Sequence, residues 1–428
     1  MSDLTFPTGF LWGTATAAHQ VEGGNSNSDW WAFENKPDSP CKEPSGTAIE
    51  HYTRYARDIA LLAGLGLNTY RFSVEWARIE PSEGMFDQKE LDHYRRMVDI
   101  THKSKLTPIV TLNHFTLPKW VADRGGWLAP STPEAFERFT RHVVQTLGDG
   151  VTWYCTINEP GMVALGGYAG GFVFPPGVTG VDNWKHAIAN LIAAHKRARA
   201  AIKQMRPDAM VGQTHAMQEF EANAGGSAVM KYSRHMMEDV FLEASADDDF
   251  IGVQTYTRTI FELPRLAGIT ASIALAIPMI ERAAVTRFMS SQKRTGAGTN
   301  HDPDVRRTQM GWEFRPEAVA ATVRRVASLL PGKPILVTEH GVATANDEER
   351  IEFITGGLTA LHAVIEDGIP LKGYIHWSAF DNFEWASGYS MEFGLIAVDR
   401  TTQVRTMKPS ARFLGELARA NRLKSPGV

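Results

Sequence analysis

Short apolar segments rich in β-branched residues alternate with longer segments of helical periodicity along this chain of 428 residues. The short segments are typical of strands buried in a parallel sheet, and the longer ones of helices that cover such a sheet. The alternation occurs eight times, and eight such units close into a barrel. We therefore predict an α/β fold, a single (β/α)8 TIM barrel with elaborated βα loops. The expected strands are Phe10–Ala15, Leu67–Val74, Thr107–Leu112, Val151–Ile157, Met210–Thr214, Phe250–Gln254, Ile335–Thr338 and Gly373–Trp377.

The length of the chain would also allow two or three domains, but single α/β barrels commonly reach this size. No stretch rich in Gly, Ser or Pro divides the sequence, and it contains no low-complexity run. We therefore expect one domain over residues 1–428. Between the strands, helices are expected at Tyr52–Leu65, Lys89–Lys103, Pro133–Leu147, Trp184–Met205, Pro316–Leu330 and Glu348–Asp367.

The segment 266–289 does not fit the alternation. It is mostly apolar, and its uncharged part is too short to cross a membrane. Three interpretations are open: a helix packed on the barrel, a hydrophobic lid over the substrate entrance, or an interfacial patch. Because the segment follows the sixth strand, it belongs to the loops that surround the active site of a barrel.

Two glutamates stand where expected strands end. Glu159 follows the run Val151–Ile157 and precedes a proline, and Glu339 follows Ile335–Thr338. Strand ends of this kind face the active site of a barrel, so both carboxylates are placed for acid/base chemistry on one bond. Because a proline disfavours the helical conformation of the preceding residue, we expect Glu159 to have an extended backbone. Either glutamate alone would more often be a solvated rim residue, but the pair is a strong signal.

Other side chains occupy comparable positions. Arg71 points into the barrel if its neighbour points out, and a buried guanidinium needs an anion such as a catalytic carboxylate. Tyr256 follows the sixth strand, where its hydroxyl can donate to a nearby carboxylate. Amide, imidazole, carboxyl and indole groups at strand ends can also contact a sugar, although loop hydrogen bonds and core packing explain such residues too. These further candidates are Gln20, His114, Trp377 and Glu384.

Charge and cysteine content narrow the function classes. A net charge of −4 and an isoelectric point near 6.4 give no basis for binding nucleic acid or an anionic membrane. The cysteines, Cys41 and Cys155, lack metal-ligand spacing, and we expect no metal and no cofactor. Cys155 lies inside an expected strand and is interpreted as a small buried hydrophobe. Because the N-terminus lacks a basic region followed by an apolar one, we expect no signal peptide and a cytoplasmic location.

Taken together, the motifs resemble family 1 glycoside hydrolases, the β-glucosidase family, over essentially the whole chain. Motifs this numerous, in this order, are highly specific, and they imply the same eight-stranded barrel. The matching segments are Phe6–Gly13 with Gln20, Arg71–Ser73, Thr156–Pro160, Thr338–Gly341, and Trp377–Ser378 through Asp381–Trp385.

The resemblance also implies a role for each matching residue. Glu159 would be the general acid/base and Glu339 the nucleophile. Arg71 and Tyr256 would keep the nucleophile charged and oriented. The residues expected to hold the non-reducing sugar are Gln20, His114, Asn158, Glu384 and Trp385, with Trp377 as the stacking platform.

The reaction implied is hydrolysis of a terminal, non-reducing β-D-glucosyl residue with retention of configuration. Retention needs carboxyl groups roughly 5–5.5 Å apart, one attacking the anomeric carbon and one protonating the departing oxygen. A neighbouring arginine favours the ionised form of Glu339, whereas burial and a like charge favour the protonated form of Glu159. Asn158 would bond the 2-hydroxyl of the sugar, a contact that strengthens in the transition state.

Several positions differ from the family pattern. His340 and Gln254 stand where asparagine is usual, and Thr255 replaces a common tyrosine. The stretch 113–116 replaces His-His-Trp-Asp, and Gly161 replaces an aromatic residue often found after the proline. None of these differences removes a catalytic group. They surround the leaving-group side and the shell behind the nucleophile, so they bear on aglycone preference and pH optimum more than on reaction type.

Other functions have less support. A 6-phospho-β-glycosidase would need a phosphate-binding set where Glu384 stands, and a carboxylate there would repel the phosphate. A non-catalytic sugar-binding barrel would usually lack one of the two carboxylates. Transglycosylation to a hydrophobic acceptor uses the same intermediate and stays open, since the apolar segment 266–289 could favour a bulky apolar aglycone or acceptor. Gln20 and Glu384 suit either orientation of the 4-hydroxyl, so the sequence does not separate β-glucosides from β-galactosides and β-fucosides.

Overall fold

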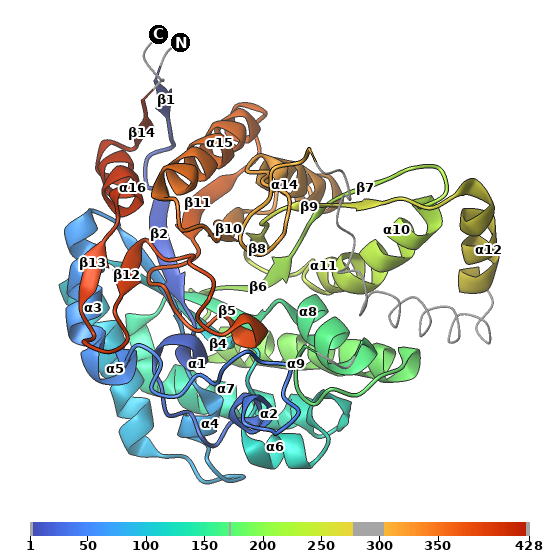
Figure 1. The fold of residues 1–428 in the computed structure, drawn as a ribbon. Helices are drawn as coiled ribbons and strands as arrows, with labels where there is room; N and C mark the ends of the chain where they lie inside the picture. Colours follow the sequence, from blue (N-terminus) through green and yellow to red (C-terminus); the bar gives the residue numbers. More distant parts are fainter. Residues whose placement is uncertain (1–2, 171–172, 277–303, 425–428) are drawn as a thin grey trace.

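Eight parallel strands form a closed barrel in the computed structural model, which describes residues 3–170, 173–276 and 304–424 (Figure 1). Neighbours around the ring follow the order of the chain, and β11 pairs with β2 to close it. This arrangement confirms the predicted α/β barrel. The strands are β2 (Leu11–Thr16), β3 (Thr69–Ser73), β4 (Thr107–Asn113), β5 (Trp153–Asn158), β6 (Met210–Ala216), β8 (Ile251–Gln254), β10 (Ile335–His340) and β11 (Leu371–His376).

The ends of these strands lie within two residues of the predicted ends. One difference concerns the site, because Glu339 lies inside β10 and not after it. The strand extends further than its apolar run because β10 pairs with both neighbours there, Glu339 with Gln254 of β8 and His340 with His376 of β11. The backbone of Glu339 is therefore fixed by the barrel itself.

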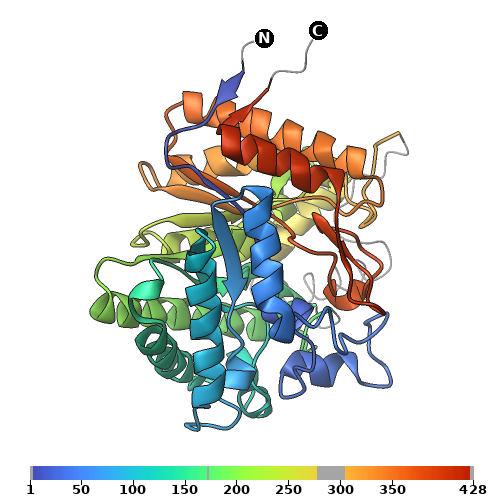
Figure 2. The same ribbon diagram turned by 90° about the vertical axis from the view of Figure 1, so that its left-hand side faces the viewer.

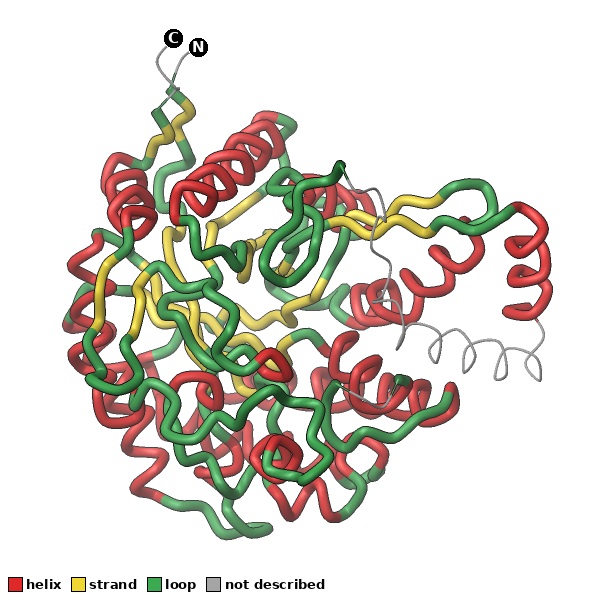
Figure 3. The backbone as a smooth tube through the Cα atoms, viewed as in Figure 1, coloured by secondary structure: helices red, strands yellow, loops and turns green. Residues whose placement is uncertain are grey.

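Helices surround the barrel as an outer layer (Figure 3). Their ends follow local sequence signals: Asp87 accepts hydrogen bonds from the first amides of α5, and Gly66 ends α3 with a φ of +97°. Each predicted helix is present, and a C-terminal helix, α16, completes the layer. These helices are α3 (His51–Leu65), α5 (Gln88–Lys103), α7 (Thr132–Leu147), α9 (Val181–Met205), α14 (Ala318–Leu329), α15 (Asp347–Glu366) and α16 (Pro409–Ala420).

Apolar side chains fill the interior of the barrel. Ala15, Ile109, Cys155, Leu336 and Ile375 are fully buried and pack in one cluster. Cys155 is thus a small buried hydrophobe, as expected. Because side chains fill the barrel, it is not an open channel, and the active site is expected at the end where the loops after the strands form a rim.

The loops after β6 and β8 form an excursion at the edge of the barrel, on the right of Figure 1. Strands β7 (Glu219–Ala222) and β9 (Arg258–Phe261) pair in parallel, and α12 (Arg265–Ala276) packs against α10 (Ser227–Arg234). The segment predicted as 266–289 is therefore helical as far as 276, but this helix packs on α10 and not on the barrel. Residues 277–289 lie outside the described residues.

The remaining described elements are short. The first and last described strands, β1 (Leu4–Thr5) and β14 (Arg422–Leu423), pair antiparallel at the top of Figure 2. None of the helices in the described residues is long and apolar enough to cross a membrane.

The other elements are α1 (Ala18–Val21), α2 (Asp29–Glu34), α4 (Trp76–Ile79), α6 (Lys119–Asp123), η1 (Gly126–Leu128), η2 (Gly148–Gly150), α8 (Pro160–Ala164), η3 (Leu165–Ala169), η4 (His235–Asp239), α11 (Val240–Ala244), η5 (Trp385–Ser387), β12 (Ile396–Val398) and β13 (Arg405–Met407).

Candidate active site

Glu159 and Glu339 line one cavity of about 1070 Å³ at the rim of the barrel. Most of the residues predicted to hold a sugar line the same cavity. Two predicted residues do not line it: Arg71 and Gln20 lie behind the wall and contact the carboxyl groups that do. The residues that the structure brings together along the cavity are His114, Asn158, Glu159, Tyr256, Glu339, Trp377, Glu384 and Trp385.

The backbone of Glu159 is not extended, and our expectation was wrong on this point. Glu159 has φ +46° and ψ +56°, in the left-handed region that non-glycine residues rarely occupy. The following proline does exclude the right-handed helical conformation, but it leaves the left-handed one accessible. The amide of Glu159 donates to the carbonyl of Thr214 on β6 (2.9 Å), and Pro160 starts α8 directly. A sharp turn from strand to helix therefore sets the direction of this side chain.

Both carboxylate oxygens of Glu339 are held by hydrogen bonds. Nη1 of Arg71 donates to Oε1 at 2.6 Å, and the hydroxyl of Tyr256 donates to Oε2 at 2.5 Å. Charge-assisted bonds of this kind are short and fix the plane of the carboxylate. Glu339 is therefore oriented from two sides, while its outer face lines the cavity.

The guanidinium of Arg71, on β3, is hydrogen-bonded to residues of three other strands, β4, β5 and β10. Besides Glu339, it donates to the side-chain oxygen of Asn158 (2.6 Å), the hydroxyl of Thr111 (3.0 Å) and the carbonyl of Thr338 (3.3 Å). Only 1% of the residue is exposed. A cation buried this deeply is stabilised by its acceptors, so Arg71 and Glu339 form one structural unit.

The surroundings of the two glutamates move their pKa values differently. Burial raises the pKa of Glu159 well above its ordinary value, and the negative charge of Glu339 raises it further. Burial also raises the pKa of Glu339, but the charge of Arg71 and the hydrogen bond from Tyr256 lower it. Because Glu159 has no hydrogen-bond donor of this kind among the described residues, protonation is favoured at Glu159 and ionisation at Glu339.

Asn158, next to the acid, has its carbonyl oxygen fully engaged. Oδ1 accepts hydrogen bonds from Arg71, from the hydroxyl of Thr214 (3.0 Å) and from the amide of Gln254 (2.9 Å). The three donors fix the orientation of the side chain, so its amide N–H groups are the ones that remain for a ligand and for His114. Gln254, which replaces a usual asparagine, is one of the groups that fix it.

His114 is a neutral imidazole in this setting. Burial lowers its pKa well below the ordinary value, and the charge of Arg71 lowers it further. Its Nε2 lies 3.3 Å from the amide nitrogen of Asn158, which can only donate, so Nε2 accepts and the proton resides on Nδ1. The ring lies nearly parallel to Trp377 (17°) and Trp385 (12°). His114 therefore offers a hydrogen-bond donor beside two indole rings.

Glu384 is held from behind by Gln20. The amide of Gln20 donates to Oε2 of Glu384 (3.2 Å) and to the carbonyl of Phe383 (2.7 Å). Burial and the charge of Glu339 raise the pKa of Glu384 to about 8, and the hydrogen bonds with Gln20 and Trp377 oppose the rise. In the free protein at pH 7, Glu384 is therefore mostly protonated and can both donate and accept.

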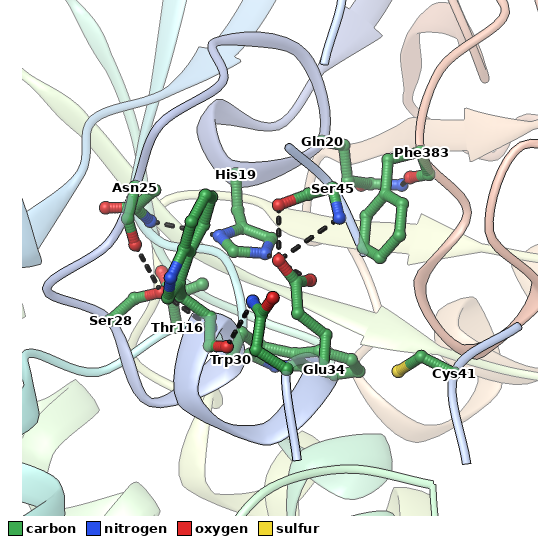
Figure 4. Close-up of polar contacts among 12 residues, drawn as sticks. His19, Gln20, Asn25, Ser28, Trp30, Glu34, Cys41, Ser45, Thr116 and Phe383 are labelled. Carbon is green, nitrogen blue, oxygen red and sulfur yellow. Dashed lines mark hydrogen bonds and ion pairs between the residues drawn. The ribbon is translucent and has the colours of Figure 1, made fainter. Parts of the chain in front are cut away.

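Trp385 packs against His19, which belongs to a polar cluster that the sequence did not point to. Figure 4 shows the members of this cluster, His19, Asn25, Glu34 and Ser45. The ring of His19 lies parallel to the Trp385 ring, with an angle of 3° and centroids 5.7 Å apart. The amide of Asn25 contacts Nδ1 of His19 (3.0 Å), so Nε2 carries the proton and donates to Glu34 (3.2 Å). Glu34 also accepts two hydrogen bonds from Ser45. No motif or spacing in the sequence links these residues, so only the folded chain brings them together.

The residues that differ from the family pattern behind the nucleophile have structural partners. Nε2 of His340 contacts the carbonyl of Pro316 (3.1 Å), and its Nδ1 contacts the hydroxyl of Tyr374 (3.0 Å). Burial lowers the pKa of His340 to about 4, so this ring is neutral. The hydroxyl of Thr255 pairs with that of Thr322 on α14 (2.7 Å). Both residues support β8 and β10 from outside and do not line the cavity.

Comparison with known proteins agrees with this geometry. The family model described as glycosyl hydrolase family 1 matches residues 2–423. The chain is 31% identical to β-glucosidase A of Thermotoga maritima, covering 99% of this chain and 100% of that one. It is also 31% identical to a bifunctional β-D-glucosidase/β-D-fucosidase of Bifidobacterium breve, over 95% and 96% of the two chains.

Solved structures give the same result. The crystal structure of the β-glycosidase BGL167 superposes with a TM-score of 0.84 at 40% identity and covers 99% of both chains. A β-glycosidase from Pyrococcus horikoshii superposes with a TM-score of 0.85 at 31% identity, covering 99% of this chain and 97% of that one. Since the family model spans nearly the whole sequence, the chain belongs to glycosyl hydrolase family 1.

Proposed function

We propose that this protein is a retaining β-glycosidase that hydrolyses terminal, non-reducing β-D-glucosyl residues in two displacements. The observation that carries the proposal is the contrast between two carboxyl groups in one cavity. Glu339 is oriented by Arg71 and Tyr256, whereas burial and the charge of Glu339 favour the protonated form of Glu159. One group is thus suited to attack and the other to donate a proton.

In the first displacement, the carboxylate of Glu339 attacks the anomeric carbon and forms a glycosyl ester. Glu159 gives its proton to the departing oxygen, so the aglycone leaves as a neutral alcohol. The positive charge that develops on the sugar is stabilised by the nearby carboxylate. A hydrogen bond from the amide of Asn158 to the 2-hydroxyl would strengthen at this stage, and its oriented side chain supports that role.

In the second displacement, Glu159 acts as a base. Formation of the ester removes the negative charge at Glu339, and that charge is one cause of the raised pKa of Glu159. The pKa of Glu159 therefore falls once the intermediate has formed, so it can accept a proton from water. Water attacks the anomeric carbon from the side of Glu159 and gives its proton to Glu159, while the bond to Glu339 breaks and releases its carboxylate. The product therefore keeps the β configuration.

The residues of the cavity wall favour an unphosphorylated sugar over a sugar 6-phosphate as the substrate. The argument from repulsion by Glu384 is weaker than the sequence suggested, because this group is mostly protonated at pH 7 in the free protein. A phosphate would also need a cation. Among the described residues that line the cavity, the basic side chain is Arg258, which already pairs with Glu313 (2.8 Å) and Glu221 (3.1 Å).

The glycone is proposed to be glucose, with fucose or galactose as further possibilities for the same subsite. The relative from Bifidobacterium breve is named as both a β-D-glucosidase and a β-D-fucosidase, and its similarity supports a subsite that tolerates change at the 4- and 6-positions. Glu384, which Gln20 holds from behind, is the polar group of the wall that would meet the 4-hydroxyl. A panel of nitrophenyl glycosides would order these sugars by kcat/KM.

Chemical rescue tests the roles of the two glutamates. With an activated aryl β-D-glucoside, Glu339→Ala should be inactive until azide is added, and the product should then be the α-glucosyl azide. Glu159→Ala should form the intermediate and give the β-glucosyl azide. Glu313→Gln, which changes another carboxylate of the cavity wall, is the matched control and should need no azide. Failure of azide to rescue either alanine variant would contradict the assignment.

Two expectations from the sequence stay predictions. One domain over residues 1–428 predicts a single cooperative unfolding transition, which calorimetry would show as equal calorimetric and van't Hoff enthalpies. A cytoplasmic location predicts that the protein separates with the cytosol when cells are fractionated.

A further inference from the structure

The cavity extends well beyond the residues expected to bind the sugar. Its volume of about 1070 Å³ is at the upper end of the range for ligand sites, about 300–1,000 Å³. From the carboxyl groups the cavity continues along α8 to β9, α10 and α12 of the excursion. Figure 1 shows where these elements lie at the edge of the barrel. Helix α8 starts immediately after Glu159, so the extension lies next to the proposed acid. The aglycone, whose oxygen Glu159 protonates, would therefore lie in this extension.

Apolar side chains dominate the wall of the extension. Met162 and Leu165 come from the helical segment after Glu159, and Phe220 and Phe261 come from the paired strands β7 and β9. Tyr232 of α10 adds a further ring. Walls of this kind gain free energy from burying apolar surface, with no preference for hydrogen-bonding groups.

Three polar groups of this wall already have partners. Arg258 pairs with Glu313, the hydroxyl of Thr257 contacts the carbonyl of Glu313 (3.0 Å), and the hydroxyl of Thr270 donates to the carbonyl of Leu266 (3.1 Å). A second sugar ring would bring several hydroxyl groups that each need a partner. The wall therefore suits an apolar group better than a further sugar.

Helix α12 determines the width of the extension. Small side chains of this helix, Ala267, Ala271 and Ala274, line the cavity. Leu266 and Ile269 of the same helix are 76% and 53% exposed and do not line it. Leu266 and Ile269 thus point away from the cavity, whereas Leu275 near the end of the helix also lines it. The three alanines leave room where a bulky ligand would lie.

We propose that the extension is a binding site for an apolar aglycone larger than one aromatic ring, either a long alkyl chain or a fused-ring skeleton. This inference rests on the proposed β-glucosidase function, because the carboxyl groups at one end of the cavity define where the sugar lies. It narrows the substrate class to amphiphilic β-glycosides.

Binding of alkyl 1-thio-β-D-glucosides tests the proposal without depending on turnover. Affinity, measured by calorimetry below the micellar concentration, should rise from the ethyl to the octyl compound by up to about fourfold per methylene. Ala271→Phe should lower the affinity for the octyl compound at least tenfold and leave that for the ethyl compound unchanged. Leu266→Phe, a matched enlargement of an exposed residue on the same helix, should change neither. A steroid β-D-glucoside, tested as a competitor, distinguishes a fused-ring site from a linear one.

Equal affinity for the ethyl and octyl compounds would overturn the proposal, and so would tighter binding of cellobiose than of octyl thioglucoside. Chain-length-dependent binding by a protein that hydrolyses no aryl glucoside would support this inference and contradict the proposed function. If Ala271→Phe does not fold, as shown by its circular dichroism, the chain-length series with the unaltered protein still decides the question.

Discussion

Nη1 of Arg71 lies 2.6 Å from Oε1 of Glu339, and these two buried, oppositely charged groups are 268 positions apart in the sequence. The pair crosses the interior of the barrel from β3 to β10, so the closed ring of strands sets its geometry. Arg71 thereby supports the charge of the proposed nucleophile and also the orientation of Asn158.

Replacement of Arg71 by methionine should therefore impair catalysis through Glu339. Loss of the guanidinium removes the main influence that lowers the pKa of Glu339, so this pKa should rise. Because Glu339 must be ionised to attack, the acid limb of the kcat/KM profile should move to higher pH. We expect kcat/KM to fall by about 10²-fold or more. Arg54→Met, which breaks a solvent-exposed pair with Glu50, is the control and should leave the pH profile unchanged.

Glu339→Gln should lower the pKa of Glu159. The charge of Glu339 is the second largest cause that raises this pKa, after burial, and the neutral amide removes it. An NMR titration of labelled glutamate carboxyl carbons would compare the variant with the unaltered protein. Glu384→Gln is an informative comparison, because Glu384 is a smaller cause and its loss should shift the Glu159 resonance less. An unchanged pKa in Glu339→Gln would show that the two groups are not coupled, and the two-role mechanism would lose its basis.

Acid should destabilise the fold through His340. Burial lowers its pKa to about 4 in the folded protein, whereas an unfolded histidine titrates near 6.5. Between these values the unfolded chain binds more protons, so stability is fully present above about pH 6.5 and is lost as the pH falls toward 4. Between pH 7 and pH 5, the free energy of unfolding of His340→Gln should therefore fall by about 2 kcal/mol less than that of the unaltered protein. Urea unfolding at the two pH values would measure both. The control is His102→Gln at the surface, which should follow the unaltered protein.

Much of the barrel was predictable because strands buried on both faces leave continuous apolar runs, and the ends of those runs locate residues such as Glu159 and Trp377. The conformation of Glu159 was not predictable in the same way. Its left-handed backbone depends on a hydrogen bond to Thr214, 55 residues later in the chain, and on the helix that starts at Pro160. The proline after Glu159 disfavours the right-handed helical conformation. Tertiary contacts then stabilise the left-handed conformation over the extended one.

The residues around the site were also not predictable from local sequence. His19 packs on Trp385 and reaches Glu34, but no spacing in the sequence connects these residues. For α12, apolar composition indicated a helix, whereas the surface that it covers depends on α10, which follows a different barrel strand. Contacts between loops of different strands therefore set the size of the cavity, and they are not encoded in any local pattern.

An apolar aglycone site also predicts glycosyl transfer to apolar alcohols. The alcohol oxygen would attack the anomeric carbon of the glycosyl ester, the bond to Glu339 would break, and Glu159 would take the hydroxyl proton, so that an alkyl β-glucoside forms in place of glucose. Because the extension adjoins Glu159, an alcohol bound there competes with water in proportion to its occupancy. With nitrophenyl β-D-glucoside as donor, hexanol should therefore raise the ratio of nitrophenol to free glucose more than ethanol at equal concentration.

The preference for hexanol over ethanol as acceptor should depend on the same side chains that line the aglycone site. Ala271→Phe should return the ratio with hexanol toward the value with ethanol, since the added ring occupies the space beside α12. Leu266→Phe should keep the ratio of the unaltered protein, because Leu266 is exposed and outside the cavity wall. Equal trapping by ethanol and hexanol would mean that the alcohol attacks from bulk solvent. In that case the extension would not hold an acceptor next to Glu159, even if hydrolysis proceeds as proposed.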